Sequence, residues 1–230
     1  MRVNDRFYIA LILFLGLFTR FVNAQDIERI SNMEGFNQNT ISSIEQDIYG
    51  FLWFGTPNGL IKYDGYEFVT YTSQSNSDGN IISNHITSLY SNDDGVLWIG
   101  SDLGLNVYIP WLEKFYSVSL PKEVSINHID VDPKGRIWFS GLKELYFCEF
   151  LDTEKGVIEV SKNVLSETVE VFEINDFSFK SKGELILATN LGLKKFEFKD
   201  SFFRENSNIP ILTDYDTFKD QSINVILKSE

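Results

Sequence analysis

Residues 50–60 read Gly50-Phe51-Leu52-Trp53-Phe54-Gly55-Thr56-Pro57-Asn58-Gly59-Leu60, and this pattern returns three times further along the chain. The later copies begin at Gly95, Gly135 and Gly183, so the opening glycines lie 45, 40 and 48 residues apart. All four copies align without a gap, and three residues after the opening glycine they carry Trp53, Trp98, Trp138 and Ile186. Constant spacing within the copies and variable spacing between them indicate one structural unit, repeated four times and joined by connections of different length.

The segment before each opening glycine predicts the first strand of the unit. In every copy an apolar residue falls nine and six residues before that glycine, as at Ile41 and Ile44. Positions three apart on a strand point to opposite faces, so we expect this strand to be apolar on both faces and to lie between two sheets. The Trp-bearing segment is the second strand, where Gly55 and Gly100 are expected to let another backbone come close.

Turn residues divide the rest of each unit. Gly59, Gly104 and Gly192 mark the turn into a third strand, and Asp64-Gly65 is a hairpin signal before a fourth strand over residues 66–71. Four short antiparallel strands in about 40–45 residues are typical of a β-propeller blade. A β-solenoid is the alternative, but its repeats are shorter, and no segment sustains the 3.6-residue period of a helical repeat.

The predicted fold is therefore all-β, with about four blades of four antiparallel strands and the first strand of a fifth. The predicted ranges are a secretory signal peptide at 1–24, an opening segment with a ring-closing strand at 25–38, blades at 39–83, 84–124, 125–170 and 171–220, and the start of a fifth blade at 221–230. The residues expected to build the blades are Gly50, Trp53, Gly55, Gly59, Gly95, Trp98, Gly100, Gly104, Gly135, Trp138, Gly183 and Gly192.

The first 24 residues have the pattern of a secretory signal. Arg2 and Arg6 precede an apolar run over residues 7–18, and Val22-Asn23-Ala24 is small where a signal peptidase cuts. The run is shorter than the roughly 20 residues that a membrane-spanning helix needs. We expect cleavage after Ala24 and an exported, periplasmic chain with no later membrane span; an uncleaved anchor is the alternative.

Composition narrows the possible partners. The formal charge is −13, and because residues 1–24 contribute +2 (three Arg against one Asp), the remainder carries −15. Such acidity argues against a nucleic-acid partner or an anionic membrane surface. The single Cys148 excludes an internal disulfide and any multi-cysteine metal site.

No catalytic or metal-binding motif stands out, and neither a cofactor nor a metal is expected. His85 and His128 do not occupy the same place in their repeats, and no second ligand accompanies either at metal-site spacing. Asp130-Val131-Asp132-Pro133-Lys134-Gly135 is similar to a calcium loop, but Lys134 replaces a needed oxygen ligand, so a hairpin turn is the favoured interpretation. His128 is expected as a polar residue near the central channel.

Loops before the first strands and after the second strands should share one face of the fold. Polar residues there are the candidate ligand contacts: Asn39, Asn58, Asn84, His85 and Asp102. Trp111 lies outside the repeat pattern on a loop, where an exposed ring could stack on a sugar or a partner. Burial of Trp111 against its own blade is the alternative.

The first repeat resembles a known family. Gly50, Trp53, Gly55-Thr56, Gly59-Leu60 and Tyr63-Asp64-Gly65 are similar to the two-component-regulator propeller repeat, which builds the periplasmic sensor region of bacterial hybrid two-component histidine kinases. The resemblance runs from about Thr40 onward; the third repeat departs from it at Ser140 and Glu144, and the fourth at Ile186 and Ala188. Residues 27–30 also resemble the opening strand that closes the ring in such domains.

The resemblance implies a non-catalytic sensor module that binds a small molecule, often an oligosaccharide released from a glycan. It allows a homodimer through the propeller in the full-length protein, whose kinase region is not in this chain. A propeller lyase or hydrolase and a secreted protein-binding scaffold are the alternatives. Residues 221–226 look like the first strand of a fifth repeat, and such propellers close with about seven blades, so we expect the 230 residues to be part of a longer product.

Overall fold

The computed structural model describes residues 38, 40–74, 80–120, 122–152, 157–161, 172–180, 184–197, 211–214 and 222–224. The predicted signal peptide, residues 27–30, Asn39, Gly183 and most of residues 221–230 lie outside this described part. Within it, no helix is long and apolar enough to span a membrane.

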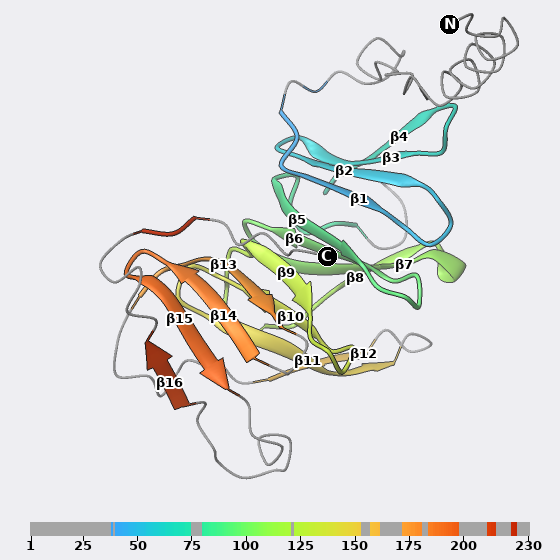
Figure 1. The fold of residues 1–230 in the computed structure, drawn as a ribbon. Coiled ribbons are helices and arrows are strands. Elements are labelled where there is room, and N and C mark those ends of the chain that lie inside the picture. Colours follow the sequence, from blue (N-terminus) through green and yellow to red (C-terminus); the bar gives the residue numbers. More distant parts are fainter. Residues whose placement is uncertain are drawn as a thin grey trace, which may run out of the picture. The chain divides into compact units, whose positions relative to one another are not determined.

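The described residues form four antiparallel sheets of four strands each, in which every strand pairs with its neighbour in the sequence (Figure 1). Sheet 1 contains β1 (Ser43–Gln46), β2 (Leu52–Thr56), β3 (Gly59–Tyr63) and β4 (Phe68–Tyr71). Sheet 2 contains β5 (Ile86–Ser91), β6 (Leu97–Ser101), β7 (Gly104–Ile109) and β8 (Lys114–Ser117), with the short 3₁₀ helix η2 (Pro110–Leu112) before β8. Sheet 3 contains β9 (His128–Val131), β10 (Ile137–Ser140), β11 (Leu145–Asp152) and β12 (Val157–Val160). Sheet 4 contains β13 (Ile174–Phe179), β14 (Glu184–Thr189), β15 (Gly192–Glu197) and β16 (Ile211–Asp214). The all-β prediction of blade-like, four-stranded sheets is confirmed.

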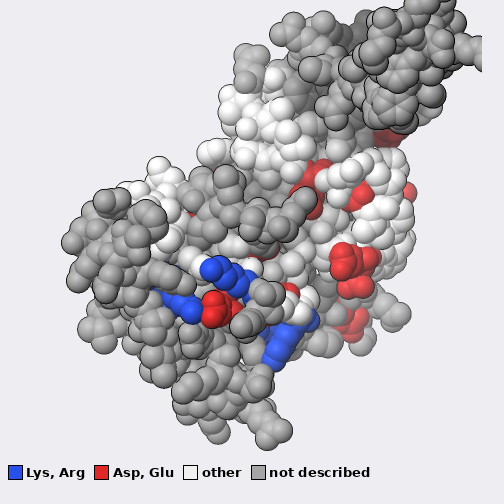
Figure 2. Space-filling model, in the orientation of Figure 1, with Lys and Arg blue, Asp and Glu red and all other residues white. Residues whose placement is uncertain are grey.

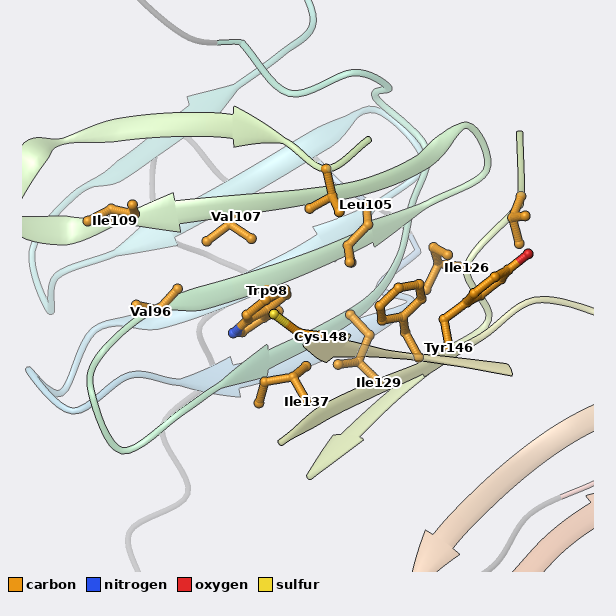
Figure 3. Close-up of a cluster of buried hydrophobic side chains, with 13 residues drawn as sticks. Val96, Trp98, Leu105, Val107, Ile109, Ile126, Ile129, Ile137, Tyr146 and Cys148 are labelled. Carbon is orange, nitrogen blue, oxygen red and sulfur yellow. The ribbon is translucent and has the colours of Figure 1, made fainter. Parts of the chain in front are cut away.

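Apolar side chains fill the space between successive sheets. Three buried clusters each join the tryptophan of one sheet to the apolar positions of the next sheet's first strand: Trp53 with Ile86 and Leu89, Trp98 with Ile126 and Ile129, and Trp138 with Ile174 and Phe177. Figure 3 shows the second cluster, where side chains of sheets 2 and 3 point toward one another. Each tryptophan is fully buried. The repeated Trp is therefore the residue that binds each sheet to the next.

A β-bulge in the first strand changes which face of the sheet its side chains point to. In sheet 2, Ile86 pairs with Ser101 and Leu89 with Ile99, and the register shifts by one residue between Ile86 and Ser88. Because Ser101 and Ile99 share a face of β6, Ile86 and Leu89 share a face of β5. The same shift occurs after Ile174 in sheet 4. The expectation that these positions point to opposite faces is therefore wrong for sheets 2 and 4, since the extra residue restores them to one face.

The glycines of the second strands leave room for a side chain rather than for a backbone. A Cβ at Gly55 would lie 2.8 Å from Cγ2 of Ile86, and one at Gly100 would lie 2.8 Å from Cγ2 of Ile126. Each isoleucine belongs to the first strand or the approach to it in the following sheet. The expected close approach is correct, but the approaching group is the isoleucine side chain.

Aspartate holds the tryptophan in sheets 1 and 3. In sheet 1 the Asp47 carboxylate accepts hydrogen bonds from the backbone N–H groups of Tyr49 and Phe51 and, through Oδ2, from Nε1 of Trp53 at 2.7 Å. In sheet 3 the Asp132 carboxylate accepts from the Lys134 and Arg136 N–H groups and from Nε1 of Trp138 at 3.0 Å. The same side chain thus shapes the β1–β2 or β9–β10 turn and satisfies the buried indole.

Polar side chains connect the innermost strands of successive sheets. Ser42 Oγ donates to the Ile86 carbonyl, and Thr87 Oγ1 donates to the Ile126 carbonyl. Asn175 Nδ2 donates at 2.7 Å to the carbonyl of Ile223. Ser42, Thr87 and Asn175 hold the same place in their repeats, eight residues before the opening glycine. The described residues 222–224 therefore bind to sheet 4 in the same way that Ile86 binds to the residue before the first strand of sheet 1 and Ile126 to the first strand of sheet 2.

Candidate functional site

The β2–β3, β6–β7, β10–β11 and β14–β15 turns, together with the segments that approach the first strands, make up what we call the loop end of the sheets. In sheets 1, 2 and 4 a hydroxyl closes the turn: Thr56, Ser101 and Thr189 each donate to the carbonyl of the glycine three residues later, at 2.8, 2.9 and 2.7 Å. Those glycines, Gly59, Gly104 and Gly192, have φ of +139°, +139° and +104°, which an L side chain resists. The residues at the tip of each of these turns, between the hydroxyl residue and the glycine, are therefore held on a rigid backbone.

The turn of sheet 3 is built differently, at the positions where the repeat departs from the family pattern. Gly141 stands where the other sheets carry the hydroxyl, and Glu144 stands where they carry glycine. The Gly141 N–H instead bonds to the Glu144 carbonyl at 2.9 Å. The Glu144 carboxylate pairs with Lys122, and this hydrogen bond raises the pKa of the Lys122 amine. A backbone hydrogen bond closes this turn in place of the hydroxyl, and the Lys122–Glu144 pair ties the turn to its approach segment.

The loop end of sheet 2 brings together two of the predicted site residues. Asp102 Oδ2 lies 3.7 Å from Nδ1 of His85, and the Asp102 N–H bonds to the His85 carbonyl at 3.3 Å. Ser83 Oγ donates to the other carboxylate oxygen of Asp102 and accepts the His85 N–H at 3.0 Å. The side chains of His85 and Asp102 are 54% and 41% exposed. Solvent and small ligands can therefore reach an imidazole and a carboxylate that are already held in place.

The hydrogen bonds of this cluster do not form a nucleophilic triad. A serine nucleophile needs its hydroxyl proton directed to an imidazole nitrogen, whereas Ser83 Oγ gives its proton to Asp102. The arrangement offers donors and acceptors for binding: the imidazole, the outer lone pairs of the carboxylate and the neighbouring backbone. Leu103, at the tip of the same turn, is 56% exposed and adds an apolar contact.

The other candidates at the loop end make hydrogen bonds apart from this cluster. Asn58 Nδ2 donates to Gln38 Oε1 at 2.9 Å, and Asn84 Oδ1 accepts the N–H of Ser73 at 2.8 Å. Asn190 acts in the same way in sheet 4, where Oδ1 accepts the Glu173 N–H at 2.8 Å. The structure brings His85 and Asp102 into one cluster and places Asn58 and Asn84 in separate ties. Asn39 lies outside the described residues.

Trp111 is on the opposite end of sheet 2 from this cluster. It lies on η2, between β7 and β8, and its side chain is 49% exposed. Glu113, which ends η2, has φ of +51°, a left-handed conformation that costs free energy for a residue with a Cβ. Trp111 is therefore presented to solvent on a strained turn, away from His85 and Asp102.

His128 joins sheets 3 and 4. Its Nε2 lies 3.3 Å from Oδ1 of Asp176, and its ring meets the Phe177 ring edge-on with centroids 4.9 Å apart. Asp176 Oδ1 also accepts the Phe177 N–H at 2.8 Å. These contacts tie two innermost strands together. Among the residues that the structure describes, no three His, Cys, Asp or Glu side chains are grouped as metal ligands would be.

Sequence reasoning missed Ser83, which orients both members of the His85–Asp102 pair. Its signal was present, because a hydroxyl two residues before His85 can accept the His85 N–H in a local turn. What the sequence could not supply is the contact with Asp102, since that depends on how the approach segment crosses the β6–β7 turn.

Comparisons with known proteins agree with the repeat pattern. The family model "Two component regulator propeller" matches residues 35–58 and 80–102. A histidine kinase P4 of Formosa agariphila is 35% identical to this chain over 72 residues, which are 31% of this chain and 5% of that kinase. The chain therefore spans a small fraction of the length of this relative.

Solved structures share the fold. The extracellular domain of a B. thetaiotaomicron protein, described as a one-component system, superposes with a TM-score of 0.60 at 21% identity over 81% of this chain and 24% of that chain. Virginiamycin B lyase of Staphylococcus aureus superposes with a TM-score of 0.52 at 15% identity over 79% of this chain and 58% of that chain. At such identities these likenesses establish the fold alone. The match of the family model shows that residues 35–58 and 80–102 are similar to two-component regulator propeller repeats, and the solved structures show that this chain shares their all-β fold of blade-like sheets.

Proposed function

We propose that this chain is an extracytoplasmic ligand-sensing segment of a two-component signalling protein. The observation that carries the proposal is the match of the two-component regulator propeller model to the first two repeats. The likeness to a histidine kinase over 72 residues supports it. The predicted signal peptide agrees with an exported, periplasmic location. In this function the sheets bind a ligand and transmit a change to a kinase encoded elsewhere in the signalling protein.

The ligand site that we propose is the cluster of Ser83, His85 and Asp102 with Leu103. Exposed carboxylate and imidazole groups can exchange hydrogen bonds with hydroxyl groups, and the adjacent leucine can cover an apolar ring face. This combination suits a glycan-derived oligosaccharide. Because Ser83 and the Asp102 N–H hold the pair before a ligand arrives, little ordering is needed on binding.

A ligand screen by thermal unfolding tests this proposal. A ligand at 100 times its dissociation constant stabilises the folded state by about 2.7 kcal/mol, which corresponds to a rise in Tm of roughly 5–10 °C for a chain of this size. We expect such a rise with at least one oligosaccharide in a panel of neutral and acidic glycan fragments. Substitution Asp102→Asn should abolish most of the rise.

Asp94→Asn is the matched control, because Asp94 is an exposed aspartate in the β5–β6 turn at the other end of the same sheet. It should leave the ligand-induced rise unchanged. A rise that survives Asp102→Asn would place the ligand elsewhere, and no rise with any glycan fragment would contradict the proposed ligand class.

The alternative of a propeller lyase has one observation in its favour, the shared fold with virginiamycin B lyase. The geometry of Ser83, His85 and Asp102 does not favour it, because the serine proton is committed to the carboxylate. Turnover of a bound oligosaccharide, detected as new reducing ends or unsaturated products, would support the lyase over the sensor.

A further inference from the structure

The cluster at the loop end of sheet 2 places two hydrogen-bonding atoms side by side at the surface. Nδ1 of His85 and Oδ2 of Asp102 lie 3.7 Å apart, which is too far for a hydrogen bond between them. The other carboxylate oxygen, Oδ1, already accepts the Ser83 hydroxyl proton. Oδ2 therefore keeps lone pairs for a ligand, and in one tautomer of the neutral imidazole Nδ1 is an acceptor as well.

The donors at the centre of the cluster are already used. The Asp102 N–H bonds to the His85 carbonyl at 3.3 Å, and the His85 N–H bonds to Ser83 Oγ at 3.0 Å. The Ser83 hydroxyl proton goes to the Asp102 carboxylate. What the centre leaves open is an acceptor with a full negative charge, so a ligand that donates hydrogen bonds fits it best.

Sheets 1 and 2 bring no basic side chain other than His85 to this end. Residues 38–120 contain two lysines, Lys62 and Lys114, and no arginine. Lys62 Nζ lies over the Phe51 ring before β2, 3.7 Å from the ring centroid, and Lys114 opens β8 shortly after η2. Both belong to the end of the sheets opposite the β6–β7 turn. On the face shown in Figure 2, the described surface where sheets 1 and 2 lie in Figure 1 carries red atoms and no blue ones.

The neighbouring turn of sheet 3 leaves this balance unchanged. The approach segment of sheet 3 bonds to the β6–β7 turn through its backbone. Lys122 of that segment is paired with Glu144. The remaining charges there are the exposed Glu123 and the exposed Lys143, which are opposite in sign. Asp102 is therefore the charge in excess at this part of the loop end.

We propose that the ligand carries a protonated amine, as an amino sugar with a free amine does, and that this ammonium group binds Asp102. The inference rests on the proposed function, because it uses the same site. An ammonium group has three N–H donors, so it can bond to Oδ2 of Asp102 and Nδ1 of His85 together, whereas a hydroxyl has one donor. Hydrogen bonds between ionised partners are also about twice as strong as neutral ones. The sugar ring can then lie against the exposed Leu103.

The same geometry disfavours an acidic sugar. A carboxylate or sulfate group beside Asp102 would bring like charges together, and no lysine or arginine of sheets 1 and 2 lies at this end to compensate. The net charge of −13 repels such a ligand further and attracts a cation. The site should therefore prefer an amine to a hydroxyl and a hydroxyl to a carboxylate.

Isothermal titration calorimetry of the chain at neutral pH, where amino-sugar amines are mostly protonated, tests this order. Three disaccharides of one linkage serve as probes, those of glucosamine, glucose and N-acetylglucosamine, which differ only in the group on the second ring carbon. A galacturonic acid disaccharide is the acidic probe. The glucosamine disaccharide should bind at least about tenfold more tightly than the glucose disaccharide, and the galacturonic acid disaccharide should bind most weakly.

Asp102→Asn should remove the preference, because the amide keeps an oxygen for the Ser83 hydroxyl but loses the charge. The affinity for the glucosamine disaccharide should then fall to that for the glucose disaccharide. Asp94→Asn, at the other end of sheet 2, should keep the preference. Unchanged thermal unfolding of both variants shows that the fold is intact. A preference for the amine that survives Asp102→Asn would overturn the inference, because attraction by the whole acidic chain would then explain it.

Two further outcomes separate the inference from the proposed function. Equal affinity for the amine and the hydroxyl, or tighter binding of the galacturonic acid disaccharide, overturns the inference and leaves a glycan sensor in place. If none of the four disaccharides binds, the inference is wrong, and the proposed function is decided by the wider thermal screen.

Discussion

Sheets 1 and 3 differ from sheet 2 in how the central tryptophan is held. In sheets 1 and 3 an aspartate six residues before the tryptophan accepts the indole N–H. In sheet 2 the same position is Asn92, whose Oδ1 still accepts the Val96 N–H at 2.8 Å. Nε1 of Trp98 is buried and has no hydrogen-bond partner among the described residues. Asparagine therefore retains the turn but loses the bond to the indole.

This difference distinguishes two roles of the aspartate side chain in sheets 1 and 3: it shapes the turn, and it accepts the hydrogen bond of the indole. Shaping the turn needs an oxygen that accepts backbone N–H groups, which an amide supplies as well as a carboxylate does. Satisfying the indole needs a second acceptor, and the amide offers an N–H₂ group there instead. Sheet 4 carries Lys180 and Ile186 at the two positions, so the acceptor and the donor are both missing. Sheet 2 alone retains the donor without its carboxylate.

Removing the carboxylate from sheet 1 should give the largest effect. Asp47→Ala leaves the buried indole of Trp53 and two turn N–H groups without their acceptor, and we expect a loss of about 2–4 kcal/mol in the free energy of unfolding. Urea unfolding followed by tryptophan fluorescence measures this loss. Asp47→Asn should cost less, about 1–2 kcal/mol, because it reproduces the arrangement of sheet 2. Equal losses for the two variants would show that the turn contributes nothing.

Repairing sheet 2 should give a smaller effect of the opposite sign. Asn92→Asp supplies the carboxylate that Trp98 lacks, and we expect a gain of about 1 kcal/mol from the new bond to a charged acceptor. The matched control is the same substitution in a Trp98→Phe background, where no indole N–H is present and the gain should disappear. A gain that persists without the indole would assign the effect to the turn.

The fold could be predicted from the sequence because the repeat leaves little choice of where the strands and turns lie. Four aligned copies locate Trp53, Trp98 and Trp138, and the turn residues separate the strands between them. The bulge after Ile86 was not predictable, because a register shift depends on where β5 meets β6 and leaves no mark on the apolar spacing. The aspartate six residues before the tryptophan was visible in two copies, yet its bond to the indole follows only from the three-dimensional turn.

The candidate site was predictable in part. Loops before the first strands and after the second strands share one end of the sheets, and on that ground His85 and Asp102 were predicted to lie together; the structure places their Nδ1 and Oδ2 atoms 3.7 Å apart. Asn58 and Asn84 were predicted on the same ground but make separate hydrogen bonds. A polar loop residue looks the same in a sequence whether it binds a ligand or stabilises a turn. Trp111 could not be assigned to an end from its spacing alone.

The smallest predicted effect concerns the innermost strands, where sheets 1 and 2 again differ. Five residues before the opening glycine, sheet 1 carries Glu45, whose carboxylate accepts the Ser91 N–H at 2.9 Å, and sheet 2 carries Tyr90. Burial raises the pKa of Glu45 above its ordinary value of 4.5, although the bond from Ser91 lowers it in part. Burial and nearby acids raise the pKa of Tyr90 to about 12, so Tyr90 stays neutral at ordinary pH.

A carboxyl group with a raised pKa in the folded state stabilises the fold most below the pKa of the unfolded chain, and that contribution is lost as the pH rises through the folded pKa. Glu45→Gln removes the ionisable group, so this pH-dependent loss of stability disappears, while the amide keeps an oxygen that can accept the Ser91 N–H. The free energy of unfolding of the unsubstituted chain, relative to Glu45→Gln, should therefore fall as the pH rises from about 4 toward neutrality. Tyr90→Phe should show no such trend over the same range. Urea unfolding at a series of pH values measures both differences, and a difference for Glu45→Gln that is flat or rises with pH would mean that the carboxylate gains more from Ser91 than it loses by burial.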